Sequence, residues 1–458
     1  MALMRTDKIM GQVFSIRGMA RIALVAILLG FVMKAEIDPV TSYTSITEFF
    51  NLPTNATTAI PVTEIVTSDK IEAAPTAEPT SAPASNLFSV PAGFENRVSF
   101  WVDIYSKYTA EDAVFHDSQN LSRVYKVVDL RPIMSSNLHP FVKEHRAKKL
   151  IEKERASLLA NLRTLKKNFT KTVNQSLKNE AAKNKNIELY ELLGRPKKVA
   201  VVNEAIENLR MQLGQKSFVE KALVSSDLYL PIMEKIFEQK GLPIELTRMP
   251  FVESSFNLAA RSRVGASGIW QIMPATGRKL MPNEIVDYRN DPIKATEFAA
   301  SLLKFNFKVI GTWPLAITAY NHGPTSIVKL TRKYKTKDLP TLINKVYGSH
   351  AFAFASSNFY ACFLAMLEVE RNREKYFPEI PRQLPIEFTS IQLKKSINYK
   401  QLLSWFDKDA KKADQFNPHL ASSVKRGSAK IPAGTYLYVP SILNELASKD
   451  FPRLARKI

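Results

Sequence analysis

Helical spacing of apolar residues, interrupted by helix-start and helix-stop signals, most constrains how residues 227–371 can fold. The first such segment predicts a helix from Asp227 to Lys240, with Ser226 or Asp227 at its start and Gly241 after its end. Its apolar residues share one helical face: Tyr229, Ile232, Met233, Ile236 and Phe237. This face is expected to pack onto a helical core.

Three further helices are expected in this part of the chain: Asp291–Ile310, Trp313–Tyr320 and Ser356–Arg371. Asp291 is a natural N-cap, and Gly311 and Gly323 follow the ends of two of these helices. No alternating strand pattern is present, apart from a small β excursion that we expect around Gly265–Gln271. The predicted fold class is therefore mainly α.

The N-terminus predicts export. An apolar run from Ile22 to Met33 follows four basic residues: Arg5, Lys8, Arg17 and Arg21. This is the layout of a secretory signal, and the run is shorter than the roughly 20 residues of a typical membrane-spanning helix. Residues 1–35 are expected to be a signal peptide cleaved after Ala35 or, alternatively, an uncleaved membrane anchor with its basic end inside.

Residues 36–92 are expected to be a disordered linker, because they are rich in proline, threonine and alanine and poor in large apolar residues. Such a composition cannot bury enough surface to offset the entropy of ordering. Residues 93–222 are predicted to form a basic helical accessory region without visible chemistry. Within it, Phe100–Tyr105 and Val124–Val128 have helix-like spacing, and residues 139–215 contain few glycines.

The formal net charge of +21 favours anionic partners. Lysine and arginine are concentrated between Lys143 and Lys198 among interspersed glutamates, which is typical of the solvated face of a charged helix. No zinc-finger spacing, aromatic RNA-binding pattern or recognition helix is present, so nucleic acid is not expected. The single cysteine, Cys362, allows no intrachain disulfide, and the six scattered histidines lack metal-ligand spacing, so no metal is expected.

Glu253 is the first candidate for catalysis. It follows the apolar segment Met249–Val252, so its carboxyl group can be desolvated, which raises a carboxyl pKa. A raised pKa suits a general acid that protonates a glycosidic oxygen near neutral pH. The alternative is a surface glutamate at a helix end.

Two further segments carry groups suited to sugar binding. Residues 262–277 contain three glycines that suggest tight turns and close approach of the backbone to a ligand: Gly265, Gly268 and Gly277. Here Trp270 offers an apolar surface and Gln271 an amide, although both residue types are also common in cores. A third segment places the phenol of Tyr320 and the amide of Asn321 at a helix end.

Together these segments resemble the soluble-lytic-type family of lytic transglycosylases, most closely its membrane-bound transglycosylase D branch. The family pattern is a Glu-Ser pair, then a Gly-Ala-x-Gly segment that continues through Gln to Pro-x-Thr, then Ala-Tyr-Asn-x-Gly. This sequence has, in that order, Glu253-Ser, Gly265-Ala-Ser-Gly-Ile-Trp-Gln-Ile-Met-Pro-Ala-Thr and Ala319-Tyr-Asn-His-Gly. The resemblance covers residues 225–375 and implies a goose-type, lysozyme-like bundle of helices with a cleft, with a catalytic domain at 223–378.

The resemblance implies a role for each matching residue. Glu253 is expected to be the catalytic glutamate. The expected substrate-binding residues are Ser262, Gly268, Trp270, Gln271, Met273, Tyr320, Asn321 and Tyr360. Among them, Ser262 is expected beside the substrate's N-acetyl group, and the Tyr320-Asn321 pair beside the acid and the scissile sugar. The late cleft tyrosine of the family falls on Tyr360, with Phe359 one residue away as the alternative.

The resemblance also implies a reaction on peptidoglycan glycan strands without a cofactor. An ordinary glycosidase places two carboxylates around the bond, whereas here one motif glutamate stands out. Glu253 is expected to protonate the oxygen between N-acetylmuramic acid and N-acetylglucosamine and then to deprotonate the muramyl 6-hydroxyl, which closes a 1,6-anhydro ring. The alternatives are a lysozyme-like hydrolase and a non-catalytic wall-binding protein. The implied location is the periplasm of a Gram-negative bacterium, free or tethered to the inner membrane.

Residues 386–441 are expected to form a second, small α+β module. Phe388–Leu393 alternates like a strand, Tyr399–Phe406 is a candidate helix, and Tyr436–Pro440 is a candidate closing strand. Asp414-Gln-Phe-Asn-Pro-His resembles part of a LysM glycan-binding repeat, which implies a strand-helix-helix-strand unit. The usual Gly-Asp-Thr opening is missing, and a structural cap that binds no glycan is the alternative.

Overall fold

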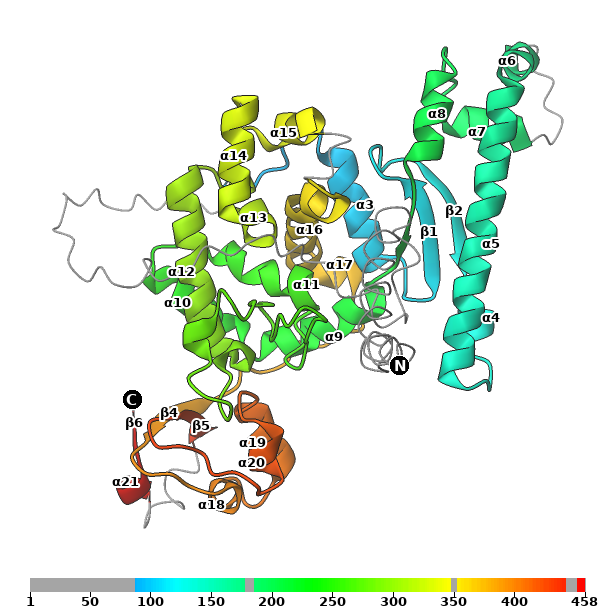
Figure 1. Cartoon of the computed structure of the whole chain (residues 1–458). Helices are drawn as coiled ribbons and strands as arrows, with labels where there is room; N and C mark the ends of the chain where they lie inside the picture. Colours follow the sequence, from blue (N-terminus) through cyan, green and yellow to red (C-terminus); the bar gives the residue numbers. More distant parts are fainter. Residues whose placement is uncertain (1–86, 178–184, 347–351, 442–450, 458) are drawn as a thin grey trace, which may run out of the picture. The chain divides into compact units, whose positions relative to one another are not determined.

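A computed structural model describes residues 87–177, 185–346, 352–441 and 451–457, which belong to one unit of the chain, residues 52–458 (Figure 1). The predicted signal or anchor at 1–35 and residues 36–86 of the predicted linker lie outside the described residues. In the part of the chain that is described, no helix is both long and apolar enough to cross a membrane. The described structure is mainly helical, which confirms the predicted fold class.

Helix α16 (Phe354–Arg371) lies at the centre of the main core. Every residue from Ser356 to Leu367 is buried, as expected of a helix that packs on all sides. Three helices pack directly against it: α3 (Glu95–Ser106), α11 (Met249–Ser254) and α13 (Trp313–His322). The candidate catalytic Glu253 therefore lies on an element that is anchored to the most buried helix of the molecule.

The helices predicted at 291–310, 313–320 and 356–371 are confirmed as α12 (Pro292–Ile310), α13 and α16. Asp291 caps α12 by accepting hydrogen bonds of 2.8 and 3.1 Å from two main-chain amides, and Gly311 ends the helix with φ of 92°. The other helical segments around this core are α9 (Lys216–Asp227), α10 (Leu230–Gln239), η3 (Ile244–Arg248), η4 (Arg278–Leu280), η5 (Tyr288–Asn290), α14 (Pro324–Tyr334), α15 (Leu339–Val346) and α17 (Arg373–Tyr376).

The predicted N-cap at Ser226 or Asp227 is wrong. Asp227 is the last residue of α9, and α10 begins after Tyr229 without a side-chain cap. The carboxylate of Asp227 instead accepts two hydrogen bonds, of 2.8 and 3.0 Å, from the buried guanidinium of Arg373. A buried guanidinium requires such a partner, and this requirement outweighs local capping.

A three-stranded antiparallel sheet corrects the helical prediction for residues 124–128. Its strands are β1 (Asp112–Asp117), β2 (Val124–Asp129) and β3 (Leu209–Leu213), in the order β2-β1-β3. The central strand β1 is buried at every position, so it lacks the alternation that would have identified a sheet. The valines and tyrosine of β2 are residue types that favour strands.

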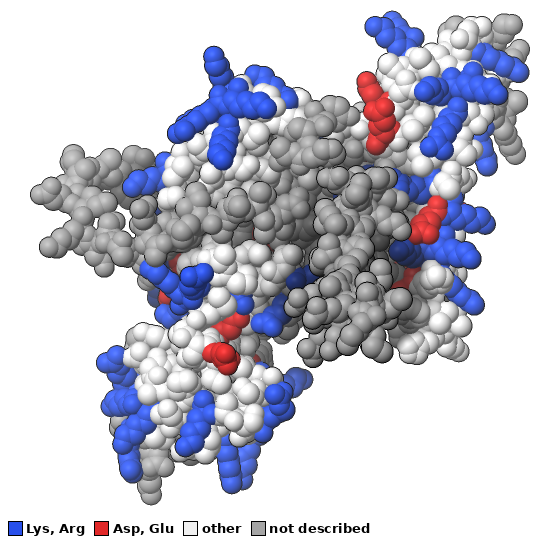
Figure 2. Space-filling model, viewed as in Figure 1, with Lys and Arg blue, Asp and Glu red and all other residues white. Residues whose placement is uncertain are grey.

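The basic helices are inserted between β2 and β3 (Figure 1). They are α4 (Arg131–Met134), α5 (Pro140–Lys167), α6 (Phe169–Leu177), α7 (Lys185–Leu192) and α8 (Ala200–Glu207). Helix α5 buries one apolar face against this group, while Arg146, Lys149 and Lys153 are exposed. Figure 2 shows lysine and arginine side chains spread over this part of the surface. These positions fit the predicted solvated face of a charged helix.

The main core extends across the boundary predicted at residue 222. Side chains of α3 belong to it together with those of α16, and the guanidinium of Arg97 and the indole of Trp101 both donate to Asn358 Oδ1, at 3.0 and 3.3 Å. The predicted linker also ends earlier than residue 92, because Phe88 is buried against Phe363 with ring centroids 5.3 Å apart. Helix α3 is therefore structurally part of the body that carries Glu253.

The C-terminal residues supply most of a second core, to which Val286 also belongs. The strands β4 (Phe388–Leu393), β5 (Tyr436–Pro440) and β6 (Ala455–Lys457) form an antiparallel sheet in the order β5-β4-β6. The helical segments are α18 (Tyr399–Ser404), α19 (Ala410–Phe416), α20 (Ser422–Lys425) and α21 (Phe451–Leu454). The predicted strand-helix-strand order is confirmed, and β6 extends the module past the predicted end at residue 441. Its kinship to LysM repeats stays a prediction.

Candidate active site

Glu253 lies in the last turn of the short helix α11, after four buried residues from Met249 to Val252. Its side chain is partly exposed, and among the described residues no group donates a hydrogen bond to it. Burial raises the pKa of Glu253 to about 8. The carboxyl group is therefore mostly protonated at neutral pH, the state that a general acid requires.

The chain that follows Glu253 is fixed by an unusual backbone. Ser255 and Phe256 have φ of 49° and 54°, in the left-handed region, which is unfavourable for residues other than glycine. Burial of Phe256 against Phe251, with ring centroids 5.2 Å apart, stabilises this conformation. The hydroxyl of Ser254 donates to Ile269 O at 3.0 Å and so joins the end of α11 to the second motif segment.

Ser262 holds a tight turn in that segment. Its amide donates to Ala266 O, and its hydroxyl accepts from Ala266 N, both at 2.9 Å. Isolated antiparallel bridges join Ser267 to Arg261 and to Ile272, which confirms the predicted β excursion. Because the hydroxyl of Ser262 already accepts a main-chain hydrogen bond, its proposed contact with an N-acetyl group would use its remaining hydrogen-bonding capacity.

Gly268 and Gln271 adopt backbone conformations that the rest of the loop enforces. Gly268 has φ of +74°, and a Cβ at this position would lie 1.8 Å from Arg289 O. The close approach expected of this glycine is therefore to the protein's own chain. Gln271 has φ of 46°. Its side-chain amide nitrogen donates to Gly268 O at 2.9 Å and to Ala260 O at 3.3 Å. Only 9% of Gln271 is exposed.

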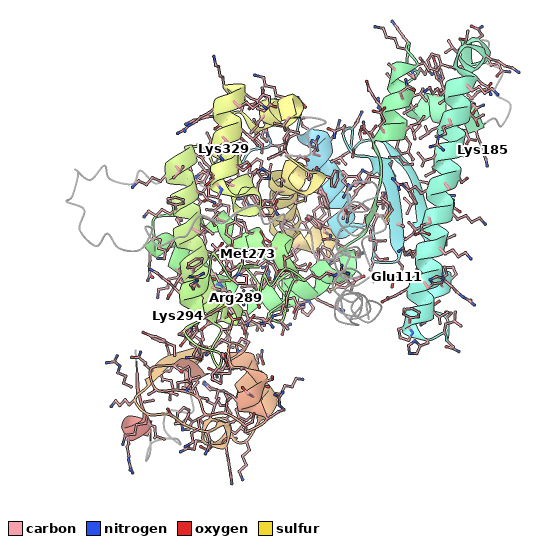
Figure 3. All side chains as sticks on the ribbon, viewed as in Figure 1. Glu111, Lys185, Met273, Arg289, Lys294 and Lys329 are labelled. Atoms are coloured by element: carbon pink, nitrogen blue, oxygen red, sulfur yellow. The ribbon has the colours of Figure 1, made fainter. Side chains whose placement is uncertain are left out.

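Arg289 and Asp287 are structural residues of the site that sequence reasoning missed. The buried guanidinium of Arg289 donates to both carboxylate oxygens of Asp287, at 2.9 and 2.8 Å. It also donates to Gly265 O at 2.8 Å and Ile272 O at 3.1 Å, so it fixes both sides of the loop. Figure 3 labels Arg289 and Met273 in this part of the structure. Met273 follows this loop and is partly exposed. The only sequence signal was the Asp-x-Arg spacing in the link before α12.

Trp270 lies beneath the loop, where no part of it is exposed. Its indole donates to Thr296 Oγ1 at 2.8 Å and stacks on Phe237 with ring centroids 5.9 Å apart. The expectation that this ring contacts the glycan is therefore wrong for the described structure. Its main-chain oxygen accepts a hydrogen bond of 2.9 Å from the hydroxyl of Tyr320.

Tyr320 lies in the same electrostatic environment as Glu253. Burial raises the pKa of Tyr320 well above its ordinary value, and the nearby charge of Glu253 raises it further. The next residue, Asn321, accepts a hydrogen bond of 3.0 Å from the hydroxyl of Ser356 through its Oδ1. That hydroxyl also lies 3.1 Å from Nδ1 of His322, so α13 and α16 are joined at this point.

Tyr360 is buried in α16, with only 1% of its surface exposed. Its ring packs against Phe94 and Phe363, with centroids 6.4 and 6.2 Å away. Phe359, the alternative position for the late cleft tyrosine, is also 1% exposed. Neither residue can contact a substrate in this structure, so the expectation of a glycan contact at this position is wrong. The residue types in the motif did not reveal which side of α16 is covered by α3.

Residues 233–342 match the family model described as the transglycosylase SLT domain. This segment of the chain is therefore similar to the SLT family. Over 199 residues it is 27% identical to the membrane-bound lytic murein transglycosylase D of Escherichia coli strain K12, and equally to that of E. coli O6:H1 strain CFT073. That alignment covers 42% of this chain and 43% of each relative, so the matched segment spans less than half the length of these proteins.

A second kind of relative covers a shorter part of this chain. It is a protein of Alteromonas sp. (strain M-1) named for tributyltin chloride resistance, 34% identical over 133 residues. The alignment covers 28% of this chain and 63% of that protein. The SLT family model and the E. coli relatives agree with the family resemblance that the three motif segments carry.

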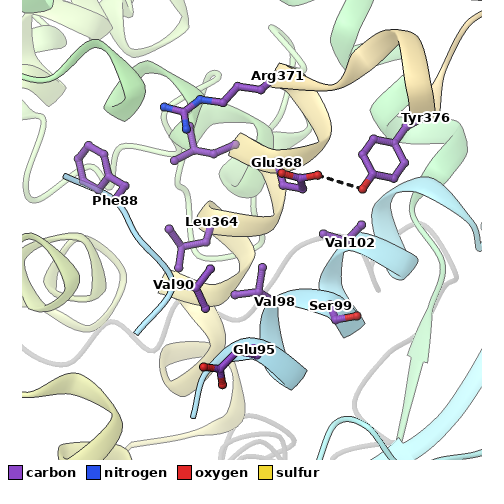
Figure 4. Close-up of a pocket in the computed structure, with 11 residues that line it drawn as sticks. Phe88, Val90, Glu95, Val98, Ser99, Val102, Leu364, Glu368, Arg371 and Tyr376 are labelled. Atoms are coloured by element: carbon purple, nitrogen blue, oxygen red, sulfur yellow. Dashed lines mark hydrogen bonds between the residues drawn. The ribbon is translucent and has the colours of Figure 1, made fainter. Parts of the chain in front are cut away.

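One pocket among the described residues lies outside the motif residues of the SLT domain (Figure 4). It has a volume of about 400 Å³ and lies between α3 and α16. Apolar side chains, among them Val98 and Leu364, form its floor, and Glu368, Arg371 and Tyr376 lie at its polar side. None of its lining residues belongs to the predicted site. No group of three His, Cys, Asp or Glu suited to a metal occurs among the described residues.

Proposed function

We propose that the SLT domain is a lytic transglycosylase that cleaves peptidoglycan glycan strands between N-acetylmuramic acid and N-acetylglucosamine, with Glu253 as its only acid/base. The observation that carries the proposal is the desolvated carboxyl group of Glu253, whose pKa is raised to about 8, next to the phenol of Tyr320. The SLT family match and the names of the E. coli relatives support the substrate and the reaction class.

In the first step, protonated Glu253 donates its proton to the glycosidic oxygen as the bond from that oxygen to the muramyl C1 breaks. N-acetylglucosamine leaves with a free 4-hydroxyl. In the second step, the carboxylate of Glu253 accepts the proton of the muramyl 6-hydroxyl, and the 6-oxygen bonds to C1. The 1,6-anhydro ring closes, Glu253 is protonated again, and no water is consumed. The muramyl 6-hydroxyl, held close to C1, acts as the nucleophile, so the second carboxylate of an ordinary glycosidase is not needed.

Three carboxylates near the motif in sequence have structural partners, which supports a single acid/base. Asp287 pairs with Arg289, Asp291 caps α12, and Glu297 pairs with Lys294 at 3.1 Å. None of them is left over to act as a second catalytic carboxylate opposite Glu253. The donors around the loop would hold the glycan, with Gln271 and Asn321 as the proposed polar contacts and Met273 as an apolar one.

The proposed location is the periplasm of a Gram-negative bacterium, with residues 1–35 as a signal or inner-membrane anchor. The name of the E. coli relatives, which are membrane-bound, supports this placement. The C-terminal module is proposed as a second contact with the glycan strand.

The test is mass spectrometry of the sugars that the full chain releases from purified peptidoglycan, beside the Glu253→Gln variant. Anhydro-muropeptides from the wild type, and at least a thousandfold less from the variant, are expected. Products with hydrated reducing ends would instead identify a lysozyme-like hydrolase. Absence of product from both proteins, with binding retained, would identify a non-catalytic wall-binding protein.

A further inference from the structure

The segment from Ile285 to Asp291 has two sides, and each side contacts a different part of the chain. On one side it holds the loop of residues 262–273, which is called the catalytic loop below. Arg289 donates to the carbonyl oxygens of Gly265 and Ile272, at 2.8 and 3.1 Å, and Ser267 Oγ donates to Asn290 Oδ1 at 2.6 Å. The conformation of the loop therefore depends on where this segment lies.

On its other side, the same segment pairs with the C-terminal module as a short antiparallel bridge. Val286 lies opposite Leu420. Two main-chain hydrogen bonds of 2.9 Å flank the pair, from Asp287 N to His419 O and from Ala421 N to Ile285 O. Val286 is 1% exposed and belongs to the core of the module. The segment is thus a structural part of both bodies.

Aromatic side chains complete this contact. The hydroxyl of Tyr288 accepts a hydrogen bond of 2.8 Å from Tyr436 N, and its ring lies 5.2 Å from that of His419. The ammonium group of Lys294 lies over the ring of Tyr436 at 4.6 Å. Asp291, the N-cap of α12, is fully buried, with its carboxylate 3.7 Å from His419 Nδ1. Without the module, these apolar and polar groups would lose their cover.

We propose that the C-terminal module positions the catalytic loop through residues 285–291, with Tyr436 and His419 as positioning residues. Gln271 keeps its left-handed backbone only while contacts around it stabilise that conformation. Arg289 contributes to these contacts through its hydrogen bond to Ile272 O. A loosened segment 285–291 lets Arg289 shift, and the loop that it holds shifts too. The catalytic consequence rests on the function proposed above, whereas the structural coupling does not.

The test is the Tyr436→Ala variant of the full chain, because Tyr436 is partly exposed and its strand pairing uses main-chain atoms. We expect kcat on soluble glycan fragments to fall about tenfold while KM changes less than twofold, because the change affects geometry and not binding. Tyr436→Phe keeps the ring and should restore wild-type kcat. The matched control is Tyr399→Phe, which removes a hydrogen bond of 2.7 Å to Asp414 inside the module and should leave kcat unchanged. An effect on KM alone would overturn the proposal in favour of a glycan-binding role.

A reversible disulfide provides a rescue. Val286 and Leu420 form a non-hydrogen-bonded antiparallel pair, whose Cα atoms are typically about 4.5 Å apart, within the range that a disulfide spans. Val286→Cys with Leu420→Cys, placed in the Tyr436→Ala background, should restore kcat when oxidised and lose it again on reduction. Failure of the oxidised form to recover, with the disulfide confirmed by mass spectrometry, would overturn the proposal.

Amide hydrogen exchange separates this inference from the proposed reaction. The amides of Ser267, Gly268 and Gln271 are all hydrogen-bonded within the loop. In Tyr436→Ala they should exchange at least tenfold faster, with no such change in Tyr399→Phe. If these amides exchange faster in Tyr436→Ala but the wild type makes no anhydro product, the proposed reaction is overturned and the structural coupling is kept. Unchanged exchange would overturn the coupling, whatever the activity.

Discussion

The hydroxyl of Tyr320 donates a hydrogen bond of 2.9 Å to the main-chain oxygen of Trp270. This bond joins the end of α13 to the loop that carries Gln271. Burial and the charge of Glu253 hold the pKa of Tyr320 well above its ordinary value, so the phenol keeps its proton at neutral pH and remains a donor. We therefore expect Tyr320 to hold this loop in position beside Glu253.

The Tyr320→Phe variant is expected to lower kcat by about tenfold to a hundredfold, because it leaves the oxygen of Trp270 without its donor and releases the loop beside Glu253. The measurement is the rate of anhydro-muropeptide release at saturating peptidoglycan. Tyr334→Phe is the matched control, since its hydroxyl has no hydrogen-bond partner among the described residues. Equal rates for Tyr320→Phe and the wild type would show that the bond has no catalytic importance.

The pH dependence of kcat should follow the titration of Glu253. The reaction needs the protonated carboxyl group, and burial raises its pKa to about 8. Activity should therefore stay high below that value and fall about tenfold for each pH unit above it. A kcat profile that instead falls near pH 4.5, the ordinary range of a glutamate, would contradict a desolvated acid.

The desolvation of Glu253 could be predicted from the sequence because the apolar run before it, Met249–Val252, is local information. The sequence also predicted the caps at Asp291 and Gly311, which depend on a few neighbouring residues. Trp270 and Tyr360 were expected to face the substrate, yet both are buried. A motif gives the residue type at a position, whereas the direction of the side chain depends on which helices pack there.

Long-range contacts account for most of what the sequence could not predict. Arg289 contacts the oxygen of Gly265, 24 residues earlier, and no local pattern marks that contact. Strand β1 is buried at every position, so it lacks the two-residue period by which a sheet is recognised. The contribution of α3 to the main core likewise depends on Asn358, which lies 261 residues after Arg97.

Removal of the carboxyl group of Glu253 should stabilise the folded chain at alkaline pH. The folded pKa is raised to about 8, above the unfolded value of about 4.3, so the folded state disfavours the ionised form. The contribution of Glu253 to the stability of the wild type should therefore be largest below about pH 4 and decrease until about pH 8, by an amount of the order of 5 kcal/mol. Glu253→Gln should lack this decrease.

Urea unfolding of both proteins at pH 4 and pH 8.5 checks this expectation. The two proteins should have similar midpoints at the lower pH, and the variant should have the higher midpoint at the upper pH. Parallel changes in the two proteins would mean that the pKa of Glu253 is close to its ordinary value. The proposal of a neutral acid at physiological pH would then lose its physical basis.

The Gly268→Ala variant tests the packing of the loop against the segment that holds it. A Cβ at this position would lie 1.8 Å from Arg289 O, and the φ of +74° is itself unfavourable for alanine. Because backbone lies on both sides, neither atom can move without displacing the loop or Arg289. We expect a loss of about 2–4 kcal/mol in the free energy of unfolding, together with a loss of activity.

Gly427→Ala is the matched control, because it measures only the cost of placing alanine in a left-handed backbone conformation. Gly427 has a similar φ of +77°, but nothing lies within 4 Å of the Cβ that alanine would add. This variant should lose only about 1 kcal/mol in urea unfolding and should retain its activity. The difference between the two variants isolates the contact with Arg289. If both substitutions lowered the free energy of unfolding by the same amount, the loop would have room to relax. The close packing at Gly268 would then not be what fixes the conformation of Gln271.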